Sequence, residues 1–428
     1  MKAKCCYPVI HKTILVLSLG LLLLLSQSCS KRPVEPEPEL QQQVEPEPEP
    51  DPPDRRAGSV PIIVQYDQPS NTLSDDDLVE IATRYRAVSD AKTLFTEAQM
   101  ARLREIDPEI RIFRYLNFAA VYGDTAIQRV LDLHPEWILR DENGDPMPSR
   151  LHETGIMIDP SSEGWRGYLA EKATQFVTQQ GYDGIMGDEV LMVNELDPEF
   201  SGINTRTGQP YTTQEYRDDQ YQIVLCVKEA LGSDKLLVLN NVKRGSGYFE
   251  EQPYRFLEAS DGVVAEGFRG LSRWPLDRYL TEEAWIDNVE MMLDVQSRQK
   301  AIVAVIKFDK DVVSSQERLR DYDLFMFTTF LMGMEDSCYY TAAIRDPEDP
   351  YGDIKLYFDY WEIDLGEPLN RYESNGSHYQ REFQNARVLV NPTDSTATVD
   401  LGGDFATLDG VMVSEITMNP HTGTILLK

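Results

Sequence analysis

The sequence predicts a (β/α)8 TIM barrel followed by a small C-terminal antiparallel β-sandwich-like domain. From residue 60 onward, short apolar segments alternate with longer segments of helical periodicity, which is the pattern of parallel strands joined by crossover helices. We count eight strand candidates over roughly 300 residues, and this count suits a (β/α)8 barrel. A doubly wound open sheet is the alternative. Its typical glycine-rich turn is replaced after the first strand by Asp67-Gln68-Pro69-Ser70.

The barrel elements are predicted one by one from apolar runs and from helix-capping residues. Several helical segments begin with Ser, Thr or Asp followed by acidic residues, as helix N-termini prefer. The predicted strands are 60–66, 87–89, 110–117, 184–188, 235–240, 262–266, 301–307 and 337–340. The predicted helices are 75–85, 96–106, 125–133, 165–180, 213–231, 281–298 and 322–334.

The helical periodicity ends near residue 364, and a different module follows. Short segments of strand character are found at 386–391, 397–401, 411–417 and 425–427. Such strands, separated by turn residues, predict a small antiparallel β module. We therefore divide the folded part of the chain into a barrel domain, 59–364, and a C-terminal β domain, 365–428. The β domain is expected to be a structural cap, with carbohydrate binding as the alternative.

The N-terminal segment 1–28 resembles a bacterial lipoprotein signal peptide. A start containing several lysines is followed by an apolar run, 14–25, and by small residues that precede Cys29. The apolar run is too short for a comfortable membrane span. The resemblance implies cleavage before Cys29 and a lipid on its thiol that anchors the protein to the membrane. The protein would then lie in the cell envelope, periplasmic or surface-exposed. A plain secretory signal is the alternative.

Residues 29–58 form a predicted linker that is rich in Pro-Glu repeats. Proline stiffens this segment and its carboxylates repel one another, so we expect an extended tether between the membrane and the folded domain. The whole chain carries a net charge of −31. This charge argues against nucleic acid as a partner, because phosphate contacts need clustered Lys and Arg. We expect the folded protein to be a monomer.

Two strand ends carry the carboxylates that predict catalysis. The segment 182–190 reads as a buried strand that ends in Asp188 and Glu189. The segment 261–268 repeats this logic, with Asp-Gly at its start and Glu266 at its end. Side chains at the carboxyl ends of barrel strands face the active-site mouth. Hydrolysis of a glycosidic bond needs two carboxyl groups, one protonated and one ionised. We therefore predict Asp188 and Glu266 as the catalytic pair.

Asp183 and Glu189 flank the first of these strands, and we assign them different roles. Asp183 precedes the apolar residues, so a capping role near the bottom of the barrel is preferred. Glu189 points away from Asp188 if the strand continues. Only one of these two acids would then face the barrel axis, and Asp188 is favoured. An ion pair with a neighbouring helix is the alternative role for Asp188.

Other polar residues at strand ends suit the binding of a sugar. Sugar hydroxyls need hydrogen-bond donors and acceptors at fixed places, and sugar C–H faces stack on aromatic rings. Every barrel needs polar strand ends, so structural roles are the alternative for each residue, and for Asp159 this role is a helix cap. The predicted substrate contacts are Tyr66, Asp67, Asn117, Asp159, Glu189, Asn240, Lys307 and Tyr340.

The sequence lacks the patterns of several other chemistries. No two of the five histidines have the spacing of metal ligands, so we expect no metal site. There is no Gly-x-Ser-x-Gly nucleophile elbow and no phosphate-binding loop. We therefore expect no cofactor.

Three stretches carry a resemblance to a family of TIM-barrel glycoside hydrolases found in secreted and lipid-anchored bacterial proteins. They also resemble, more distantly, the endo-α-1,4-polygalactosaminidase group. The stretches are 158–161 with Trp165 following, 182–188 and 261–266. The tail beyond residue 386 is similar to the β modules that end many such hydrolases. The resemblance implies a glycosidase that acts on a polysaccharide or oligosaccharide, with Asp188 and Glu266 as the catalytic pair.

Hydrolysis of a polysaccharide is therefore the predicted function, and it has two alternatives. One is a non-catalytic glycan-binding surface lipoprotein on the same scaffold, because a fold does not determine a function. The separation of the two carboxyl groups discriminates between these hypotheses, since a distance well beyond about 10 Å would make hydrolysis by this pair implausible. The other alternative is a structural surface protein, which a closed barrel mouth would favour.

Overall fold

The computed structural model describes residues 60–66, 70–91, 94–149, 154–190, 200–346, 348 and 353–428. The predicted signal peptide and linker, together with Cys29 and Asp67, lie outside the described residues. Only the backbone of Tyr66 is described.

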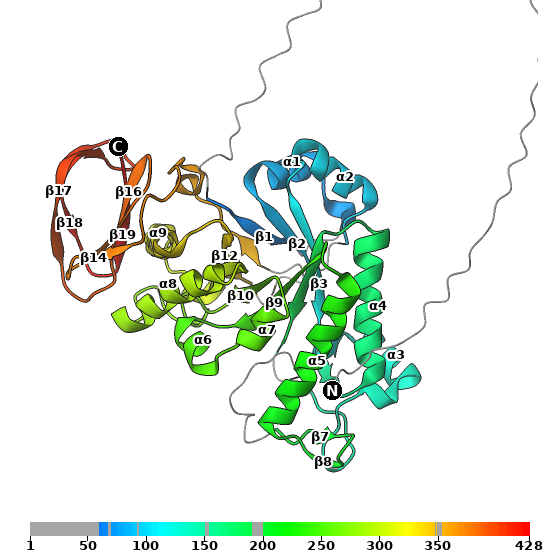
Figure 1. The fold of residues 1–428 in the computed structure, drawn as a ribbon. Helices are drawn as coiled ribbons and strands as arrows, with labels where there is room; N and C mark the ends of the chain where they lie inside the picture. Colours follow the sequence, from blue (N-terminus) through cyan, green and yellow to red (C-terminus); the bar gives the residue numbers. More distant parts are fainter. Residues whose placement is uncertain are drawn as a thin grey trace, which may run out of the picture. The chain divides into compact units, whose positions relative to one another are not determined.

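The main sheet of the described residues is a closed barrel of parallel strands (Figure 1). The strand order is β1-β2-β3-β6-β9-β10-β11-β12, and a parallel bridge between Ile62 and Tyr340 joins the last strand to the first. A short strand, β13 (Ile354–Lys355), adds antiparallel to β12. The barrel strands are β1 (Ile63–Tyr66), β2 (Ala87–Asp90), β3 (Arg111–Asn117), β6 (Gly184–Asp188), β9 (Leu236–Val242), β10 (Gly262–Ala265), β11 (Ala301–Asp309) and β12 (Cys338–Arg345). The predicted fold is confirmed, and each barrel strand overlaps a predicted strand.

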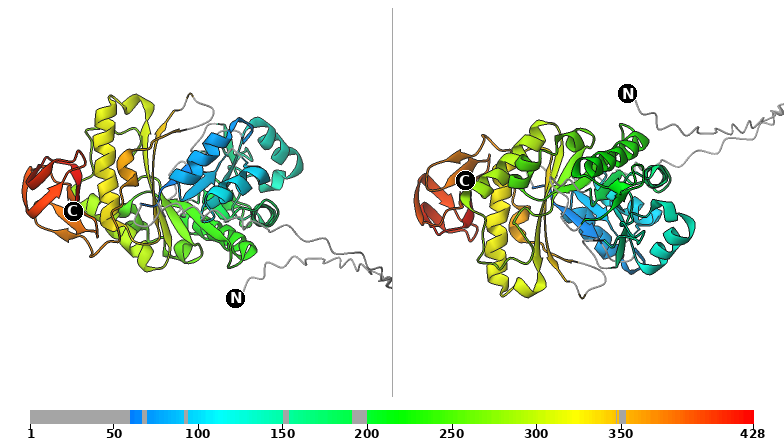
Figure 2. Two further views of the ribbon diagram at one scale, coloured as in Figure 1. Left: turned by 90° about the horizontal axis from the view of Figure 1, so that it is seen from above. Right: turned by 90° about the horizontal axis from the view of Figure 1, so that it is seen from below.

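Helices surround the barrel and cover the outer face of its strands (Figure 2). Ser74, Thr96 and Thr212 each cap a helix with a reciprocal capping box, as their residue types predicted. The helices are α1 (Asp75–Arg84), α2 (Glu97–Ile106), α3 (Asp124–Leu133), α4 (Glu163–Gln179), α5 (Thr213–Leu231), α6 (Gly245–Glu251), α7 (Tyr254–Glu258), α8 (Glu282–Ser297) and α9 (Gln316–Gly333). Four 3-10 turns are described, η1 (Ser70–Thr72), η2 (Pro135–Trp137), η3 (Lys310–Val312) and η4 (Asp359–Glu362). The sequence did not predict α6 and α7, because helices this short have no readable periodicity.

Two insertions lie on the carboxyl-terminal side of the barrel, where the loops that follow strands emerge. The insertion after β3 contains α3 and the paired strands β4 (Ala120–Tyr122) and β5 (Gly155–Met157). The insertion after β6 contains the paired strands β7 (Ile203–Asn204) and β8 (Gln209–Pro210). Figure 1 shows α3 and the β7–β8 pair at the same end of the barrel. The insertions therefore lie on the side of the barrel where β3 and β6 present their last residues.

The repeated Asp-Gly pair builds the amino-terminal ends of β6 and β10. The carboxylates of Asp183 and Asp261 each accept a hydrogen bond from a backbone amide of a neighbouring strand at 2.8 Å. Each carboxylate thus ties the start of its own strand to that neighbour. The glycines that follow pack tightly against the next strand. A Cβ atom on Gly184 or Gly262 would come within 2.4 Å or 2.6 Å of a backbone oxygen. The Asp-Gly pair is thus a structural device at the bottom of the barrel, in agreement with the role predicted for Asp183.

A six-stranded antiparallel sheet forms the C-terminal domain. Apolar residues of β16 and β19 on one face, such as Val388 and Ile425, belong to the same core as the barrel helices. Residues of the opposite face, such as Leu389 and Leu426, form a second core with β17 and β18, which gives the domain its sandwich-like character. The order is β14-β15-β16-β19-β17-β18. The strands are β14 (Glu373–Ser374), β15 (Tyr379–Glu382), β16 (Ala386–Asn391), β17 (Ala397–Ala406), β18 (Met412–Met418) and β19 (Thr422–Leu427).

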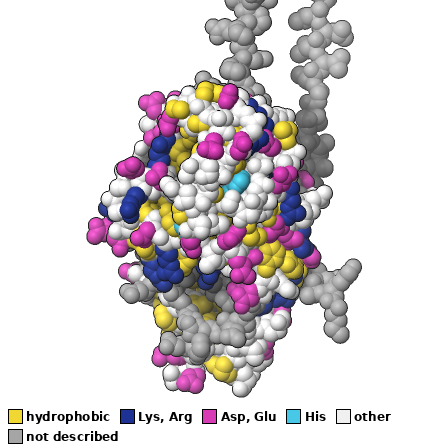
Figure 3. Space-filling model, turned by 90° about the vertical axis from the view of Figure 1, so that its left-hand side faces the viewer, with side chains coloured by type: hydrophobic (Ala, Val, Ile, Leu, Met, Phe, Trp, Pro, Cys, Tyr) yellow, Lys and Arg dark blue, Asp and Glu magenta, His cyan; other side chains and the backbone are white. Residues whose placement is uncertain are grey.

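The surface carries charges of both signs. On the face seen in Figure 3, acidic and basic side chains are interspersed with hydrophobic ones. On this face, therefore, the basic side chains do not form the continuous stripe that nucleic-acid binding needs. As a separate finding, the described part of the chain contains no helix with the length and apolar character needed to cross a bilayer.

Candidate active site

A bridge between two carboxylates marks the mouth of the barrel. Asp188 ends β6 and Glu266 follows β10, while Asn240 lies in β9, the strand between them. The side-chain nitrogen Nδ2 of Asn240 donates to Oδ1 of Asp188 at 2.8 Å and to Oε2 of Glu266 at 3.0 Å. Because one nitrogen touches both acceptors, these two oxygens are at most 5.8 Å apart. The strand order thus brings together two acids that are distant in the sequence.

Asp188 is held by three hydrogen-bond donors. The hydroxyl of Tyr115 donates to Oδ2 at 2.6 Å, and the backbone amide of Glu189 and Nδ2 of Asn240 each donate to Oδ1 at 2.8 Å. Asn117 donates to the oxygen of Tyr115 at 3.4 Å. Burial, followed by the charge of Asp188, raises the pKa of Tyr115, so this phenol keeps its proton and remains a donor. The three donors stabilise negative charge on Asp188.

Glu189 also faces this mouth, because the strand ends at Asp188 and the backbone then turns. Its φ of 55° is left-handed, which is uncommon for a residue other than glycine. Glu189 was expected to point away from Asp188 only if the strand continued, and the strand does not continue. The hydroxyl of Tyr122 donates to Oε1 of Glu189 and contacts the hydroxyl of Ser149 at 2.8 Å. Glu189 is held between β6 and β4.

The environment of Glu189 disfavours its ionised form. Burial is the main cause that raises the pKa of Glu189, and the charges of Asp188 and Glu266 raise it further. Hydrogen bonds from Tyr122 and Asn117 lower it only in part. The side chain is buried, with 8 % of its surface exposed. Glu189 thus holds its proton to a higher pH than a free glutamic acid does.

Glu266 has the opposite environment. Nζ of Lys307 donates to Oε1 of Glu266 at 2.7 Å and lies 3.6 Å from Oδ2 of Asp353. Burial alone would raise the pKa of Glu266, but the charge and hydrogen bond of Lys307 and the hydrogen bond of Asn240 outweigh it, so the pKa is lowered. The pKa of Lys307 is raised, because its carboxylate neighbours outweigh the cost of burial. Glu266 is therefore the ionised acid of the mouth.

Of the eight predicted substrate contacts, the structure brings four together and leaves two apart, while Asp67 and the side chain of Tyr66 lie outside the described residues. Asp159 is fully buried and accepts hydrogen bonds from Thr205 and Tyr211, each at 2.6 Å, which ties the β7–β8 insertion to the barrel. Tyr340 is fully buried and donates to Asp323 at 2.8 Å. Because these side chains are occupied and shielded, we leave both out of the proposed substrate contacts. The predicted residues that converge are Asn117, Asp188, Glu189, Asn240, Glu266 and Lys307.

Three residues at the mouth were not predicted from the sequence. Tyr115 lies two positions before Asn117, so the period of a strand places both on one face, and this signal could have identified it. Tyr122 and Asp353 carry no such signal. Tyr122 reaches Glu189 from β4, and Asp353 lies beyond β12. Their positions depend on loops whose course no periodicity predicts.

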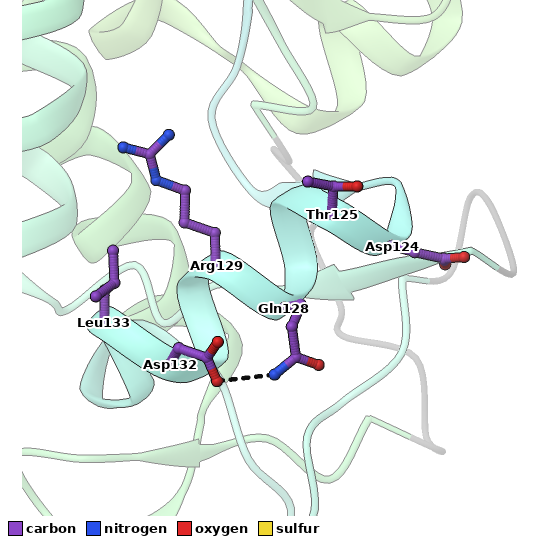
Figure 4. A pocket seen from close by; sticks show the side chains of 6 residues that line it. All are labelled: Asp124, Thr125, Gln128, Arg129, Asp132 and Leu133. Atoms are coloured by element: carbon purple, nitrogen blue, oxygen red, sulfur yellow. Dashed lines mark hydrogen bonds between the residues drawn. The ribbon is translucent and has the colours of Figure 1, made fainter.

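A hollow lies along one face of α3 (Figure 4). Figure 4 shows that Gln128 donates to Asp132 within this face. None of the predicted catalytic or substrate-binding residues lines it, so we place the candidate site at the barrel mouth. The residues that line the hollow are Asp124, Thr125, Gln128, Arg129, Asp132 and Leu133.

Among the described residues, no group of His, Cys, Asp and Glu side chains could hold a metal ion.

Comparisons with known proteins agree with this architecture. The sequence model of hypothetical glycosyl hydrolase family 15 matches residues 104–387. Among curated proteins, none is similar enough in sequence to count as a match. The maltogenic alpha-amylase AmyB from Thermotoga neapolitana has a TM-score of 0.53 at 14% identity, covering 86% of this chain and 98% of that one. An alpha-amylase from Geobacillus thermoleovorans, complexed with acarbose, has a TM-score of 0.51 at 11% identity, covering 87% and 99%. These two likenesses show the fold alone.

Proposed function

This chain belongs to hypothetical glycosyl hydrolase family 15, and we propose that Asp188 and Glu266 at its barrel mouth cleave a glycosidic bond of a polysaccharide. Membership of this family supports a glycoside hydrolase. The assignment of the reaction to these two residues is our proposal.

The observation that carries the proposal is the bridge formed by Asn240. It keeps the facing oxygens of Asp188 and Glu266 within 5.8 Å of each other. Pairs of carboxyl groups that hydrolyse glycosides lie about 5 to 9.5 Å apart. The separation is therefore within reach of a single glycosidic bond, and it falls well short of the distance that would have favoured a non-catalytic mouth.

The charges at the mouth support a division of labour. Lys307 lowers the pKa of Glu266, so this carboxylate is ionised and can act as a nucleophile or as a base toward water. The donors around Asp188 stabilise a carboxylate next to the positive charge that develops on the sugar. Asn117, Asn240 and Lys307 provide the donors that sugar hydroxyls need.

We propose an amino sugar polymer as the substrate to test first. The resemblance to endo-α-1,4-polygalactosaminidases motivates this choice, and the charge balance supports it, because ammonium groups would be attracted to carboxylates in excess. The charged groups at the mouth are the carboxylates Asp188, Glu266 and Asp353 against the cations Lys307 and Arg345.

We also propose that the protein is a monomer held at the cell envelope by a lipid on Cys29. The support is the resemblance of residues 1–28 to a lipoprotein signal and the Pro-Glu linker that follows. Replacing Cys29 by Ser should move the protein from the membrane fraction to the soluble fraction of a cell envelope preparation. An unchanged membrane fraction would contradict a lipid anchor at this residue.

Amide variants test the catalytic assignment. Asp188→Asn and Glu266→Gln should each lower turnover on a polysaccharide by about 10²–10⁴-fold, while thermal unfolding shows that the fold persists. Asp124→Asn is the matched control, because Asp124 is exposed on α3 outside the mouth. Turnover at the wild-type rate in both mouth variants would contradict the assignment of catalysis to Asp188 and Glu266. Binding of polysaccharide by the wild type without any cleavage would instead support the glycan-binding alternative.

A further inference from the structure

Glu189 is a third acid at the barrel mouth, beside the pair formed by Asp188 and Glu266. Its left-handed backbone, with φ of 55°, is the kind of local strain that persists mainly at functional sites. This turn places its carboxyl group against Tyr122, inside the mouth rather than behind the strand. We infer that Glu189 is the group that donates the proton to the leaving-group oxygen. The inference rests on the proposed function, because it assigns one step of the same reaction.

Glu189 is the carboxyl group of the mouth best placed to hold a proton. It is shielded from water, with 8 % of its surface exposed. When acids converge in one site, their like charges favour a proton on one of them, and the most buried acid is the natural holder. Burial and the two neighbouring carboxylates raise the pKa of Glu189 accordingly. The titratable groups that face it are Tyr115, Tyr122, Asp188, Tyr216 and Glu266.

The other two acids are less suited to donate a proton. Glu266 forms an ion pair with Lys307 at 2.7 Å, which favours its charged form. Asp188 accepts hydrogen bonds on both oxygens, from Tyr115, from Asn240 and from the amide of Glu189. The other two carboxyl groups of the mouth are thus already engaged, Glu266 by a cation and Asp188 by donors on both oxygens.

The step balances with water as the co-reactant. The bond between the anomeric carbon and the leaving oxygen breaks, its electron pair stays on that oxygen, and the oxygen takes the proton of Glu189. In a single displacement, the carboxylate of Glu266 takes a proton from the water that attacks the anomeric carbon. In a double displacement, Glu266 first bonds to the anomeric carbon. Water then attacks that carbon, the bond to Glu266 breaks with its electron pair returning to the carboxylate, and Glu189 takes the proton of the water. The hydroxyl of that water ends on the anomeric carbon. Its remaining proton returns to Glu189, directly or by way of Glu266 and solvent.

Two probes with different leaving groups test the inference. One is the polysaccharide that the wild type cleaves, and the other is the 2,4-dinitrophenyl glycoside of the same sugar, whose leaving group needs no proton. Glu189→Gln should lower kcat/KM, which reports the departure of the leaving group, by about 10²–10⁴-fold for the polysaccharide but by less than about tenfold for the aryl glycoside. Glu266→Gln is the matched control, because it should lose activity on both probes.

The outcomes separate this inference from the proposed function. An equal loss of kcat/KM on both probes in Glu189→Gln, with an active wild type, overturns the proton-donor role and leaves the glycosidase intact. A wild type that cleaves neither probe overturns the proposed function, and the proton-donor role with it. Infrared spectroscopy adds a readout that is independent of activity. The band of protonated carboxyl groups at neutral pH should be weaker in Glu189→Gln than in the wild type, and an unchanged band overturns the inference.

Discussion

The ion pair between Lys307 and Glu266 determines the charge at the centre of the barrel mouth. Nζ of Lys307 lies 2.7 Å from one carboxylate oxygen and is itself only partly exposed, so the interaction is stronger than that of a typical surface pair. The ion pair explains why Glu266 is ionised although its surroundings are partly desolvated. Removal of the ammonium group of Lys307 should therefore change the protonation of Glu266 while the fold persists.

Lys307→Met should move the acidic limb of the pH profile of kcat/KM to higher pH. The sign follows from the lowered pKa of Glu266, because without the ammonium group this pKa rises and less of the carboxylate is ionised at acidic pH. If the pKa rises by about 1, activity on the acidic side falls about tenfold. Lys310→Met is the matched control, since Lys310 pairs with Asp346 outside the mouth. Identical pH profiles in Lys307→Met and the wild type would contradict the ion-pair account.

Asp323, in α9, should make stability depend on pH. Burial raises its pKa to about 7, and the hydrogen bonds from Tyr360, Tyr340 and Trp361 lower it only in part. Because the folded pKa lies above the unfolded value, the folded state binds the proton more tightly. Stability should therefore fall by up to about 4 kcal/mol as pH rises from about 4 to about 7.

The variant Asp323→Asn isolates this effect, because it cannot take up that proton. The free energy of unfolding in urea should be measured for both proteins at about pH 5 and about pH 8. The free energy of unfolding of the wild type, minus that of the variant, should be smaller at about pH 8 than at about pH 5. A constant difference would show that Asp323 does not titrate in this range.

At the scale of elements, the starts of the strands depend on the Asp-Gly pairs. Gly262→Ala would place a Cβ atom 2.6 Å from the backbone oxygen of Ala301 and 2.9 Å from its Cβ atom. The strands β10 and β11 would have to separate, at a cost of about 1–3 kcal/mol in the free energy of unfolding. Gly247→Ala, in α6, is the matched control, because nothing lies within 4 Å of its Cβ position. An equal effect of both substitutions in urea unfolding would contradict this packing.

The barrel elements were predictable because each strand is a short apolar run and most long helices begin at a Ser or Thr that caps them. The paired strands of the insertions after β3 and β6 were not, since they are too short to show alternation. The same limit applies to the site. Asp188 and Glu266 follow from the ends of strands, whereas the direction of Glu189 depends on a positive φ that no residue type announces. The burial of Asp159 depends on Tyr211, a partner distant in the sequence.

At the scale of the molecule, the C-terminal sheet and the barrel share one core. One face of β16 and β19 packs against α9, so neither part buries its apolar residues alone. Arg381, in β15, is 1 % exposed and donates to the last carbonyl groups of α9, at Leu331, Met332 and Met334. The carbonyl group of Leu331 also accepts from the backbone amide of Met334 at 3.5 Å, and Arg381 supplies further donors at this end of the helix. The sheet therefore completes a barrel helix, as its predicted role as a structural cap implies.

Arg381→Met should lower the stability of the whole molecule in a single transition. The substitution leaves buried carbonyl groups without a donor, which costs at least about 2 kcal/mol. Thermal unfolding followed by near-ultraviolet circular dichroism should show one transition at a lower temperature. Arg371→Met is the matched control, because Arg371 is exposed. Separate unfolding of the sheet, with the barrel signal unchanged, would contradict a shared core.

The most direct test of the central claim is the release of reducing ends from a panel of polysaccharides, with an amino sugar polymer included. The proteins to compare are the wild type and a double variant, Asp188→Asn with Glu266→Gln. The bridged carboxylates predict release by the wild type from at least one polysaccharide and no release above buffer by the double variant. Equal release by both proteins, or binding without release by the wild type, would contradict the claim.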